Sequence, residues 1–515
     1  MRRPTRSLAA LGSVVAVTTS LTGFLGGAGA AALAALPAVH PFAAKAPDSA
    51  FGATADPGLG IACDRPEGGT DSTTVHCYTP DQMRAANGLA PLTSSATDGA
   101  GQTIVLVDAY GTPTGANDLA HFAQFFGGPT PDFETYYPLG APNYKSATGN
   151  GSGTSGPSAA EGWAGEATLD IEWAYAIAPK AHIVLLATPP AETQGVQGLP
   201  NLMKAIDAAI AKYPAGTVFS MSFGTDESAF GSTSAARAQF AKFDATFQRG
   251  LAKKDTFFAS SGDNGSVGVE RAHHQTATSA TPQVSYPNVS PYVTSVGGTQ
   301  LQYGWTWAPQ QDKPFNADGT RNTAYWNWES SGQKEQPVWN EGWASIGTGG
   351  GLSTVYPRPA YQDGVAGVVG NHRGVPDVAW NAAVNGGVLV YRSFFPTIDG
   401  APSWGIYGGT SAASPQVAAM TAIGNAARSA NHQDPIGDLN AALYAAKDKG
   451  TYDVVPRTYG STPSGHLENN RIWDTDANGF LVPGPVPGYP TTPDYDLTTG
   501  WGVPQGEDWL SALTG

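Results

Sequence analysis

Ser411 is the residue of this sequence best placed to act as a nucleophile. It lies in Gly408-Gly409-Thr410-Ser411-Ala412-Ala413-Ser414-Pro415, and an apolar run follows. The pattern predicts a glycine-rich turn that delivers the serine to the start of a buried helix, with Pro415 in the first turn, where its missing N–H costs nothing. The free N–H groups and positive dipole end of such a helix favour the negative charge that an attacking serine develops. Taken alone, the pattern also describes a serine that caps a core helix.

Glu166 and Asp170 are candidates for a base. They are four residues apart in a stretch that we expect to be helical, so they share one face of the helix. A functional interpretation makes them an interacting carboxylate pair beside a nucleophile. The alternative is coincidence in an acidic protein.

Asp263 follows directly after a predicted strand, Thr256–Ser260, in the turn Ser260-Ser261-Gly262-Asp263-Asn264-Gly265. Ligands of open parallel sheets bind at the carboxyl ends of the strands, so this side chain is expected to point into a cleft. The alternative is an aspartate in a turn whose side chain caps a backbone N–H. Asp108 closes another predicted strand in the same way.

The histidines argue against two common mechanisms. None of the nine lies in a His-Gly-Thr-like turn that opens a helix, and no H-E-x-x-H zinc pattern is present. A serine–histidine mechanism needs a histidine held close to the serine. The sequence therefore disfavours an ordinary subtilisin.

Two acidic loops near the C-terminus offer hard oxygen ligands. They are Tyr452-Asp453-Val454-Val455 and Thr492-Pro493-Asp494-Tyr495-Asp496. Carboxylates together with backbone carbonyls suit Ca²⁺. Two solvated acidic turns are the alternative.

Apolar strands alternate with helices through the region that must position these residues. Strands that are apolar throughout imply a parallel sheet with helices on both faces, an α/β fold. Residues 304–351 are expected to be long surface loops, and no boundary signal divides residues 78–515. Strands are predicted at Thr103–Val107, His182–Leu186, Thr217–Phe223 and Thr256–Ser260, and helices from Thr79–Pro80 and at Glu166–Ala178, Leu202–Tyr213 and Ala236–Leu251.

The N-terminus carries a targeting pattern. A basic start, an apolar stretch and small residues predict a signal peptide over residues 1–30, with a transmembrane anchor as the alternative. Residues 31–70, rich in Ala, Pro and Gly, are expected to be a flexible tether, which leaves residues 71–515 as the functional domain. In an exported protein the two cysteines, Cys63 and Cys77, most simply form one structural disulfide.

Composition limits the classes of partner. The chain has 515 residues and a net charge of −15, which argues against nucleic acid and anionic membrane surfaces. No stretch after the N-terminus is long and apolar enough to span a bilayer. A soluble, secreted protein without a stable membrane anchor is expected.

The ordered set of motifs resembles the sedolisin family, the serine-carboxyl peptidases with a subtilisin-like fold. The resemblance implies Ser411 as nucleophile, Glu166 as general base oriented by Asp170, and Asp263 as the donor to the oxyanion. The matching stretches are Glu166–Glu172, Ser261-Gly262-Asp263, Tyr286-Pro287, Ser290–Val293, Gly297-Gly298-Thr299, Gly349-Gly350-Gly351, Gly374–Ala379 and Gly408–Ala412.

The same resemblance implies one Ca²⁺ ion per subunit. Asp453 and Asp496 would bind it by carboxylate, and Val454, Thr492 and Asp494 by backbone carbonyls. Relatives have glycine at the positions of Thr492 and Asp494. They also have an acidic residue at the position of Asp108, which extends the acid network.

Two departures from the family stand out. Many relatives have tryptophan at the position of Phe223, so a shorter acid network is expected here. The family's long prodomain has no room before residue 71, so we expect either folding without one or a separate helper.

The sequence thus predicts a secreted, acid-acting serine endopeptidase, a monomer that hydrolyses proteins or peptides through Ser411, Glu166, Asp170 and Asp263. Unperturbed carboxyl groups would give maximal activity at roughly pH 3 to 5. One rival is a binding module on an inactive peptidase scaffold. The other is a neutral-pH subtilisin that uses an unrecognised histidine. A sharp loss of activity in His182→Ala would support this second rival.

Overall fold

The computed structural model describes residues 40–41, 44–45, 76–94, 98–142, 157–189, 196, 198–268, 281–307, 313, 316–318, 322, 328–394, 403–456, 466 and 468–514. The predicted signal peptide and most of the predicted tether lie outside these residues. Cys63 does too, so its disulfide with the buried Cys77 stays a prediction.

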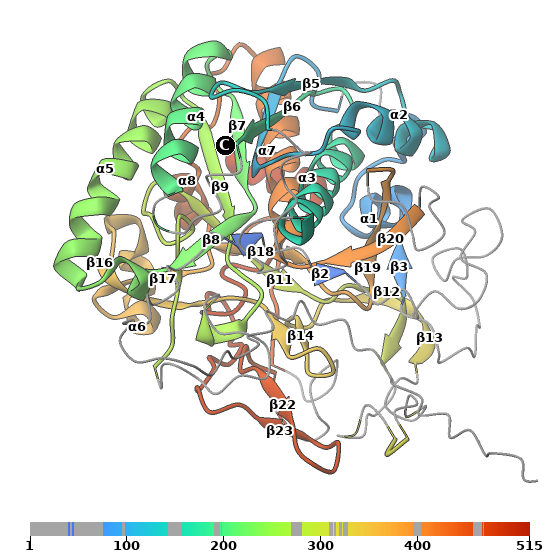
Figure 1. Ribbon diagram of the computed structural model, residues 1–515, viewed down its shortest axis with the longest axis vertical. Coiled ribbons are helices and arrows are strands. Elements are labelled where there is room, and N and C mark those ends of the chain that lie inside the picture. Colours follow the sequence, from blue (N-terminus) through green and yellow to red (C-terminus); the bar gives the residue numbers. More distant parts are fainter. Residues whose placement is uncertain are drawn as a thin grey trace, which may run out of the picture.

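A seven-stranded parallel sheet forms the centre of the fold (Figure 1). Every neighbouring pair of strands in it runs parallel. In spatial order the strands are β18 (Val378–Asn381), β11 (Thr294–Thr299), β9 (Thr256–Ser260), β7 (Val218–Met221), β4 (Thr103–Ala109), β6 (His182–Thr188) and β5 (Asp132–Tyr136).

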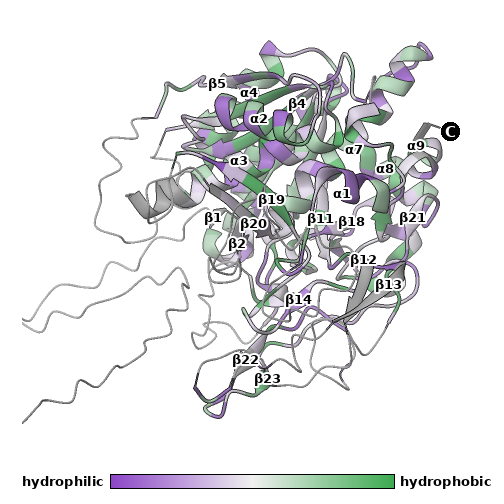
Figure 2. Ribbon diagram, turned by 90° about the vertical axis from the view of Figure 1, so that its right-hand side faces the viewer, coloured by the Kyte–Doolittle hydropathy of each residue, from purple (hydrophilic) through white to green (hydrophobic). Residues whose placement is uncertain are grey.

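Alternate residues of the central strands face opposite helical layers. In β4, Ile104 and Leu106 pack in the core beneath α3 and α7, whereas Val105 and Val107 pack beneath α4 and α5. Hydrophobic residues line the strands and α7 in the interior (Figure 2). The predicted α/β fold with helices on both faces is therefore confirmed. The helices are α1 (Pro80–Ala86), α2 (Gly115–Phe125), α3 (Pro157–Ile177), α4 (Leu199–Lys212), α5 (Thr233–Ala252), α6 (Ala366–Val369), α7 (Thr410–Ala430), α8 (Leu439–Ala446) and α9 (Gly506–Thr514).

Local signals set several of these boundaries. Thr79 forms the capping box that its sequence predicts, accepting from the Gln82 N–H while the Gln82 side chain accepts from the Thr79 N–H. The predicted strand Thr256–Ser260 matches β9. The predicted strand Thr217–Phe223 divides into β7 and the separate strand β8 (Phe223–Asp226), which leaves the sheet and pairs with β10 instead.

The expectation of surface loops over residues 304–351 is wrong for its second half. Trp339 is fully buried, and a Cβ placed on Gly298 of β11 would lie 2.8 Å from its ring. Glu341 is also buried, because its carboxylate accepts from the Trp339 indole and from the N–H groups of Val384 and Asn385. Internal hydrogen bonds thus make a polar segment part of the interior.

Short strands surround the main sheet. They are β1 (His40–Pro41), β2 (Ala44–Lys45), β3 (Cys77–Tyr78), β10 (Ser285–Tyr286), β12 (Gln302–Trp307), β13 (Trp328–Glu335), β14 (Asn340–Glu341), β15 (Ile346–Gly347), β16 (Gly351–Pro357), β17 (His372–Val375), β19 (Gly387–Arg392), β20 (Ser403–Gly408), β21 (Thr451–Tyr452), β22 (Trp473–Thr475), β23 (Leu481–Pro483) and β24 (Val503–Pro504).

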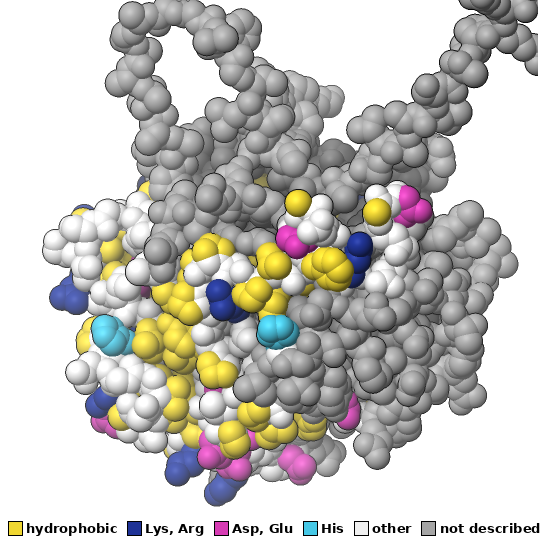
Figure 3. Space-filling model, turned by 90° about the horizontal axis from the view of Figure 1, so that it is seen from below, with side chains coloured by type: hydrophobic (Ala, Val, Ile, Leu, Met, Phe, Trp, Pro, Cys, Tyr) yellow, Lys and Arg dark blue, Asp and Glu magenta, His cyan; other side chains and the backbone are white. Residues whose placement is uncertain are grey.

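The described side chains on the face shown in Figure 3 are mostly hydrophobic or uncharged, in line with a charged content of only 13%. Among the helices of the described residues, none combines the length and the apolar character needed to cross a membrane.

Candidate active site

Ser411 is the second residue of α7, at the carboxyl end of the main sheet. β20 ends at Gly408, and Gly409 (φ 92°) turns the chain into the helix as its N-cap. The serine is fully buried, and its Oγ has no hydrogen-bond partner among the described residues. The alternative that this serine caps the helix is therefore wrong, and its hydroxyl stays available for chemistry.

The placement of Pro415 in the first turn is also wrong. Because α7 begins at Thr410, Pro415 lies in the second turn of the helix. Its missing N–H removes the usual i+4 donor to the carbonyl of Ser411. The long apolar face of α7 compensates through its packing in the core.

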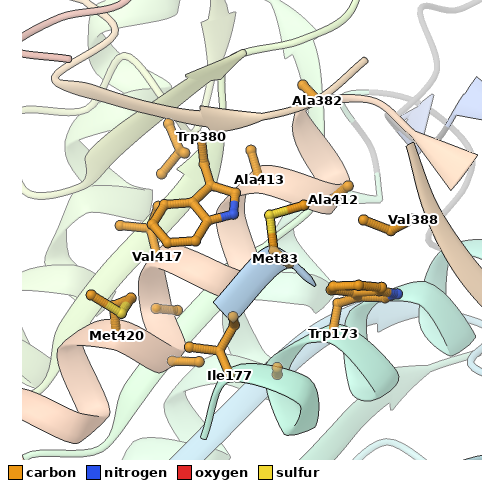
Figure 4. Packing of buried hydrophobic residues seen from close by; sticks show 14 of the residues in the cluster. Met83, Trp173, Ile177, Trp380, Ala382, Val388, Ala412, Ala413, Val417 and Met420 are labelled. Atoms are coloured by element: carbon orange, nitrogen blue, oxygen red, sulfur yellow. The ribbon is translucent and has the colours of Figure 1, made fainter. Parts of the chain in front are cut away.

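The helix with the acid pair packs directly against α7 (Figure 4). Trp173 and Ile177 of α3 lie opposite Ala412 and Val417 of α7 in the same buried cluster. Near the middle of α3, a Cβ placed on Gly165 would lie 3.2 Å from the Tyr407 hydroxyl of β20. The segment beside Glu166 therefore contacts the strand that leads to Ser411.

Three buried carboxyl groups gather around the middle of α3. Glu166, Asp170 and Asp108 all have no exposed surface. Burial raises the pKa of Asp170 well above its usual range, and the charges of Asp108 and Glu166 raise it further. A 3.1 Å hydrogen bond from Ser222 acts in the opposite direction and lowers this pKa. Burial likewise raises the pKa of Asp108. The acid pair is thus part of a cluster that resists full ionisation and retains protons.

Asp263 contacts Thr410, the residue before Ser411. Its Oδ1 accepts from both the N–H and the hydroxyl of Thr410, each at 2.8 Å. Burial raises the pKa of Asp263 to about 7, although these two hydrogen bonds act in the opposite direction. With Oδ1 occupied as an acceptor, the proton of the neutral acid resides on Oδ2. The capping alternative also holds in part, because Asp263 caps the first N–H of α7.

A glycine loop holds the Asp263 turn in place. The Gly347 N–H donates to the Asp263 carbonyl at 2.9 Å, and the Gly349 N–H donates to the Gly262 carbonyl at 2.7 Å. A Cβ placed on Gly349 would lie 2.1 Å from the Ser261 carbonyl oxygen, so no side chain fits. The site also contains three residues to which the sequence analysis assigns no role, Thr410, Ser222 and Gly349. The only signal for them in the sequence is that they lie in or next to the motifs.

His182 lies at the opposite end of the sheet from Ser411. It opens β6 beside Thr103, the first residue of β4, whereas Asp108 lies near the end of β4. Thr103 and Asp108 are five residues apart along β4, which corresponds to about 16 Å. Its ring nitrogens face Asp132 and Glu134 at 3.0 and 3.5 Å. If the protein has the peptidase activity that the sequence predicts, His182→Ala should retain near wild-type kcat/KM at every pH; a large loss would restore the histidine mechanism.

The two predicted calcium loops lie together. The Asp494 N–H donates to Asp453 Oδ2 at 3.1 Å, and the Thr492 N–H donates to Asp496 Oδ2 at 3.1 Å. Asp496 Oδ1 accepts from Thr498 and Thr499, which fixes its loop, and Val454 is buried. No group of three or more His, Cys, Asp or Glu side chains suited to a metal occurs in the described part of the chain. The oxygen donors nevertheless fit a hard cation bound by two carboxylates and backbone carbonyls.

The buried carboxyls make folding stability depend on pH. The pKa values of these carboxyl groups in the folded protein lie above the value of roughly 4 in an unfolded chain. Between these two values, the native state binds more protons than the unfolded state does at the same pH. Stability is therefore expected to be present in acid and to fall as pH rises, for Asp263 through about 7. The melting temperature should be higher near pH 4 than at neutral pH, and Asp108→Asn should flatten this slope. Equal or higher melting temperatures at neutral pH would contradict the burial of ionisable acids.

Comparison with known proteins finds relatives that are 25 to 29% identical to the chain. It is 29% identical to kumamolisin of Bacillus sp. (strain MN-32) over 429 residues, covering 81% of this chain and 60% of that protein. It is 28% identical to sedolisin of Pseudomonas sp. (strain 101), and the match covers 60% of this chain and 42% of that protein. It is 25% identical to tripeptidyl-peptidase 1 of Canis lupus familiaris, and the match covers 77% of this chain and 58% of that protein. Over most of its length the chain is thus similar to peptidases of the sedolisin family.

The fold of this sedolisin relative agrees with that of a solved structure. The Pseudomonas sedolisin (serine-carboxyl proteinase) complexed with two molecules of pseudo-iodotyrostatin matches it with a TM-score of 0.57 and 23% identity, covering 85% of this chain and 98% of that one. No family model matches the sequence. The chain spans about three fifths or less of the length of the curated sedolisin relatives it matches.

Proposed function

We propose that this protein is an acid-acting serine-carboxyl peptidase. The observation that carries the proposal is the position of Asp263, a buried acid with a pKa raised to about 7 and bonded to the residue before Ser411. A neutral carboxylic acid can donate a hydrogen bond to an oxyanion, which a carboxylate cannot. The names of the relatives, among them a serine-carboxyl proteinase and tripeptidyl-peptidases, support the same reaction class.

Each residue of the site then has one task. Ser411 Oγ attacks the peptide carbonyl carbon while Glu166 accepts its proton, and Asp170 and Asp108 keep that proton within the buried acid cluster. Asp263 donates from Oδ2 to the oxygen that becomes negative. The amine leaves with the proton from Glu166, and water then hydrolyses the serine ester by the same steps in reverse.

The direct test is hydrolysis of a denatured protein. The full chain should produce fragments at about pH 4 and few at about pH 8, where an acid with the pKa of Asp263 is ionised. Mass spectrometry of products from a mixed peptide library then separates an endopeptidase, which we propose, from release of tripeptides. Absence of any fragment at every pH would favour the binding-module alternative.

We also propose that one Ca²⁺ ion binds at Asp453 and Asp496 by carboxylate, with carbonyls from Val454, Thr492 and Asp494. When bound, the ion would hold the two loops together. Because it binds only the folded protein, a chelator should lower the melting temperature of the wild type by several degrees. The Asp453→Ala variant should have a lowered melting temperature even without chelator, and adding the chelator should not change it. Identical melting curves for all four samples would eliminate the site.

Secretion, a monomeric state and protein or peptide substrates complete the proposal. The name of the tripeptidyl-peptidase 1 relative supports protein or peptide substrates. Size-exclusion chromatography with light scattering checks the monomer, and assay of the culture medium checks secretion.

A further inference from the structure

Thr348, in the glycine loop (residues 347–350), joins separate parts of the molecule through one hydroxyl. The residue is fully buried. Its Oγ1 accepts from the Gly298 N–H of β11 at 2.8 Å. The same hydroxyl donates to the carbonyl oxygens of Thr498 and Gly349, each at 3.2 Å. One side chain thus connects the main sheet, the glycine loop and a turn near the C-terminus.

Glycines on both sides of Thr348 allow this close approach. A Cβ placed on Gly297 of β11 would lie 3.1 Å from Thr348 Oγ1 and 3.0 Å from the Thr498 carbonyl oxygen. A Cβ placed on Gly350 would lie 2.1 Å from the Leu497 carbonyl oxygen. The glycine loop therefore packs backbone against backbone on the C-terminal turn, and the Thr348 hydroxyl forms a hydrogen bond across that contact.

The C-terminal acceptor of Thr348 has a fixed direction. It belongs to the Asp496 turn (residues 496–500), in which Asp496 Oδ1 accepts from the N–H groups of Thr498 and Thr499 at 2.8 and 2.7 Å. The hydroxyls of both threonines donate to the same oxygen. Because the Thr498 carbonyl and the Thr499 N–H belong to one planar peptide unit, the bond from that N–H also fixes the carbonyl.

On its other side, the glycine loop holds the turn of Asp263. The Gly347 N–H donates to the Asp263 carbonyl, and the Gly349 N–H donates to the Gly262 carbonyl. These two donors are the residues on either side of Thr348. A displacement of Thr348 therefore moves both donors, and the Asp263 turn with them.

We propose that Thr348 is a positioning residue for catalysis, whose hydroxyl fixes the glycine loop to the main sheet and the Asp496 turn and thereby places the acid of Asp263. This inference rests on the proposed peptidase function. The Thr348 hydroxyl is occupied by backbone groups, so it acts on the rate through Asp263, the donor to the oxyanion. A displacement of about 1 Å in a catalytic group lowers the rate by about 100-fold, so kcat should depend on this hydroxyl.

The first experiment removes the hydroxyl and keeps the shape of the side chain. In Thr348→Val, the Gly298 N–H and the Thr498 carbonyl lose their partner, which should separate the glycine loop from both neighbours. We expect kcat on a fluorogenic peptide near pH 4 to fall by about 10- to 100-fold, with KM changed by less than about twofold. Rates are measured on the full chain, well below the melting temperature of every variant.

Thr294→Val is the matched control. Thr294 is the first residue of β11, fully enclosed like Thr348, and its hydroxyl donates to Asn440 at 2.8 Å. Loss of this bond should lower the melting temperature and leave kcat unchanged. Thr348→Ser, which retains a hydroxyl, should retain most of kcat. An equal loss of kcat in Thr294→Val, or a loss in Thr348→Ser as large as in Thr348→Val, would overturn the inference.

A double-mutant cycle tests whether Thr348 acts through Asp263. In Asp263→Ala the donor to the oxyanion is absent, so adding Thr348→Val should lower kcat no further. Multiplied losses would show a different route and overturn the inference. If Thr348→Val does not fold, Thr348→Ala replaces it throughout and should give the same pattern. Wild-type kcat in the variant would overturn this inference alone, whereas no hydrolysis by the wild type at any pH would overturn the peptidase function and the inference with it.

Discussion

Ser411→Ala is expected to lower kcat/KM by about 10⁴-fold or more while the protein remains folded. The hydroxyl is buried and forms no hydrogen bond within the described residues, so its removal leaves no partner unsatisfied. The variant retains Asp263 and the acid cluster, so any remaining rate reports binding and oxyanion stabilisation alone. The measurement is the initial rate on a fluorogenic peptide near pH 4.

Ser414→Ala is the matched control for this experiment. Ser414 lies one turn further along α7, and its hydroxyl bonds to Ser220 at 2.8 Å. Its loss should cost stability, about 1 kcal/mol, but little activity. Melting temperatures of both variants show that the fold persists. If Ser411→Ala retained near wild-type activity, the peptidase assignment would be wrong.

A bell-shaped pH profile with its alkaline limb near pH 7 is the second expected result. The proton on Asp263 Oδ2 is required, and burial raises the pKa of Asp263 to about 7, so activity should fall as pH rises through that value. The acid limb reflects protonation of the acid cluster, which removes the base. The active range thus extends further toward neutrality than the pH 3 to 5 expected from unperturbed carboxyls.

Asp263→Asn separates this limb from other titrations. An amide donates without ionising, so the alkaline limb should move to higher pH even if the maximal rate falls. Asp255→Asn is the control, because burial also raises the pKa of Asp255 to about 7 while its carboxylate binds the Thr217 N–H, remote from Ser411 at the start of β9. That variant should retain the wild-type limb. Maximal activity at roughly pH 7 to 8 in the wild type would falsify the carboxyl mechanism.

Local patterns predicted much of the core and the positions of the chemical groups. The apolar strands and the glycine turn before Ser411 are encoded by neighbouring residues, so β9 and the start of α7 could be located from sequence. The contact between Asp263 and Thr410 could not, because it joins residues far apart in the chain through the parallel sheet.

Other features depended on tertiary context alone. Trp339 and Glu341 lie in a polar stretch whose burial requires N–H donors from Val384 and Asn385. β1 and β2 are too short to leave a periodic pattern, and their partners lie on distant strands. The exposed edge strand β5 alternates too weakly to be predicted.

Gly349 shows how mutational tolerance can mislead about chemistry. It has no side chain and touches no reacting atom, yet a single methyl group there would push against the Ser261 carbonyl and displace the turn that aims Asp263. In a saturation screen for active variants, we expect position 349 to tolerate as few substitutions as position 411. The loss of activity on substitution of Gly349 would measure how tightly the backbone must pack around the site. It would occur even though every catalytic side chain of the variant is intact.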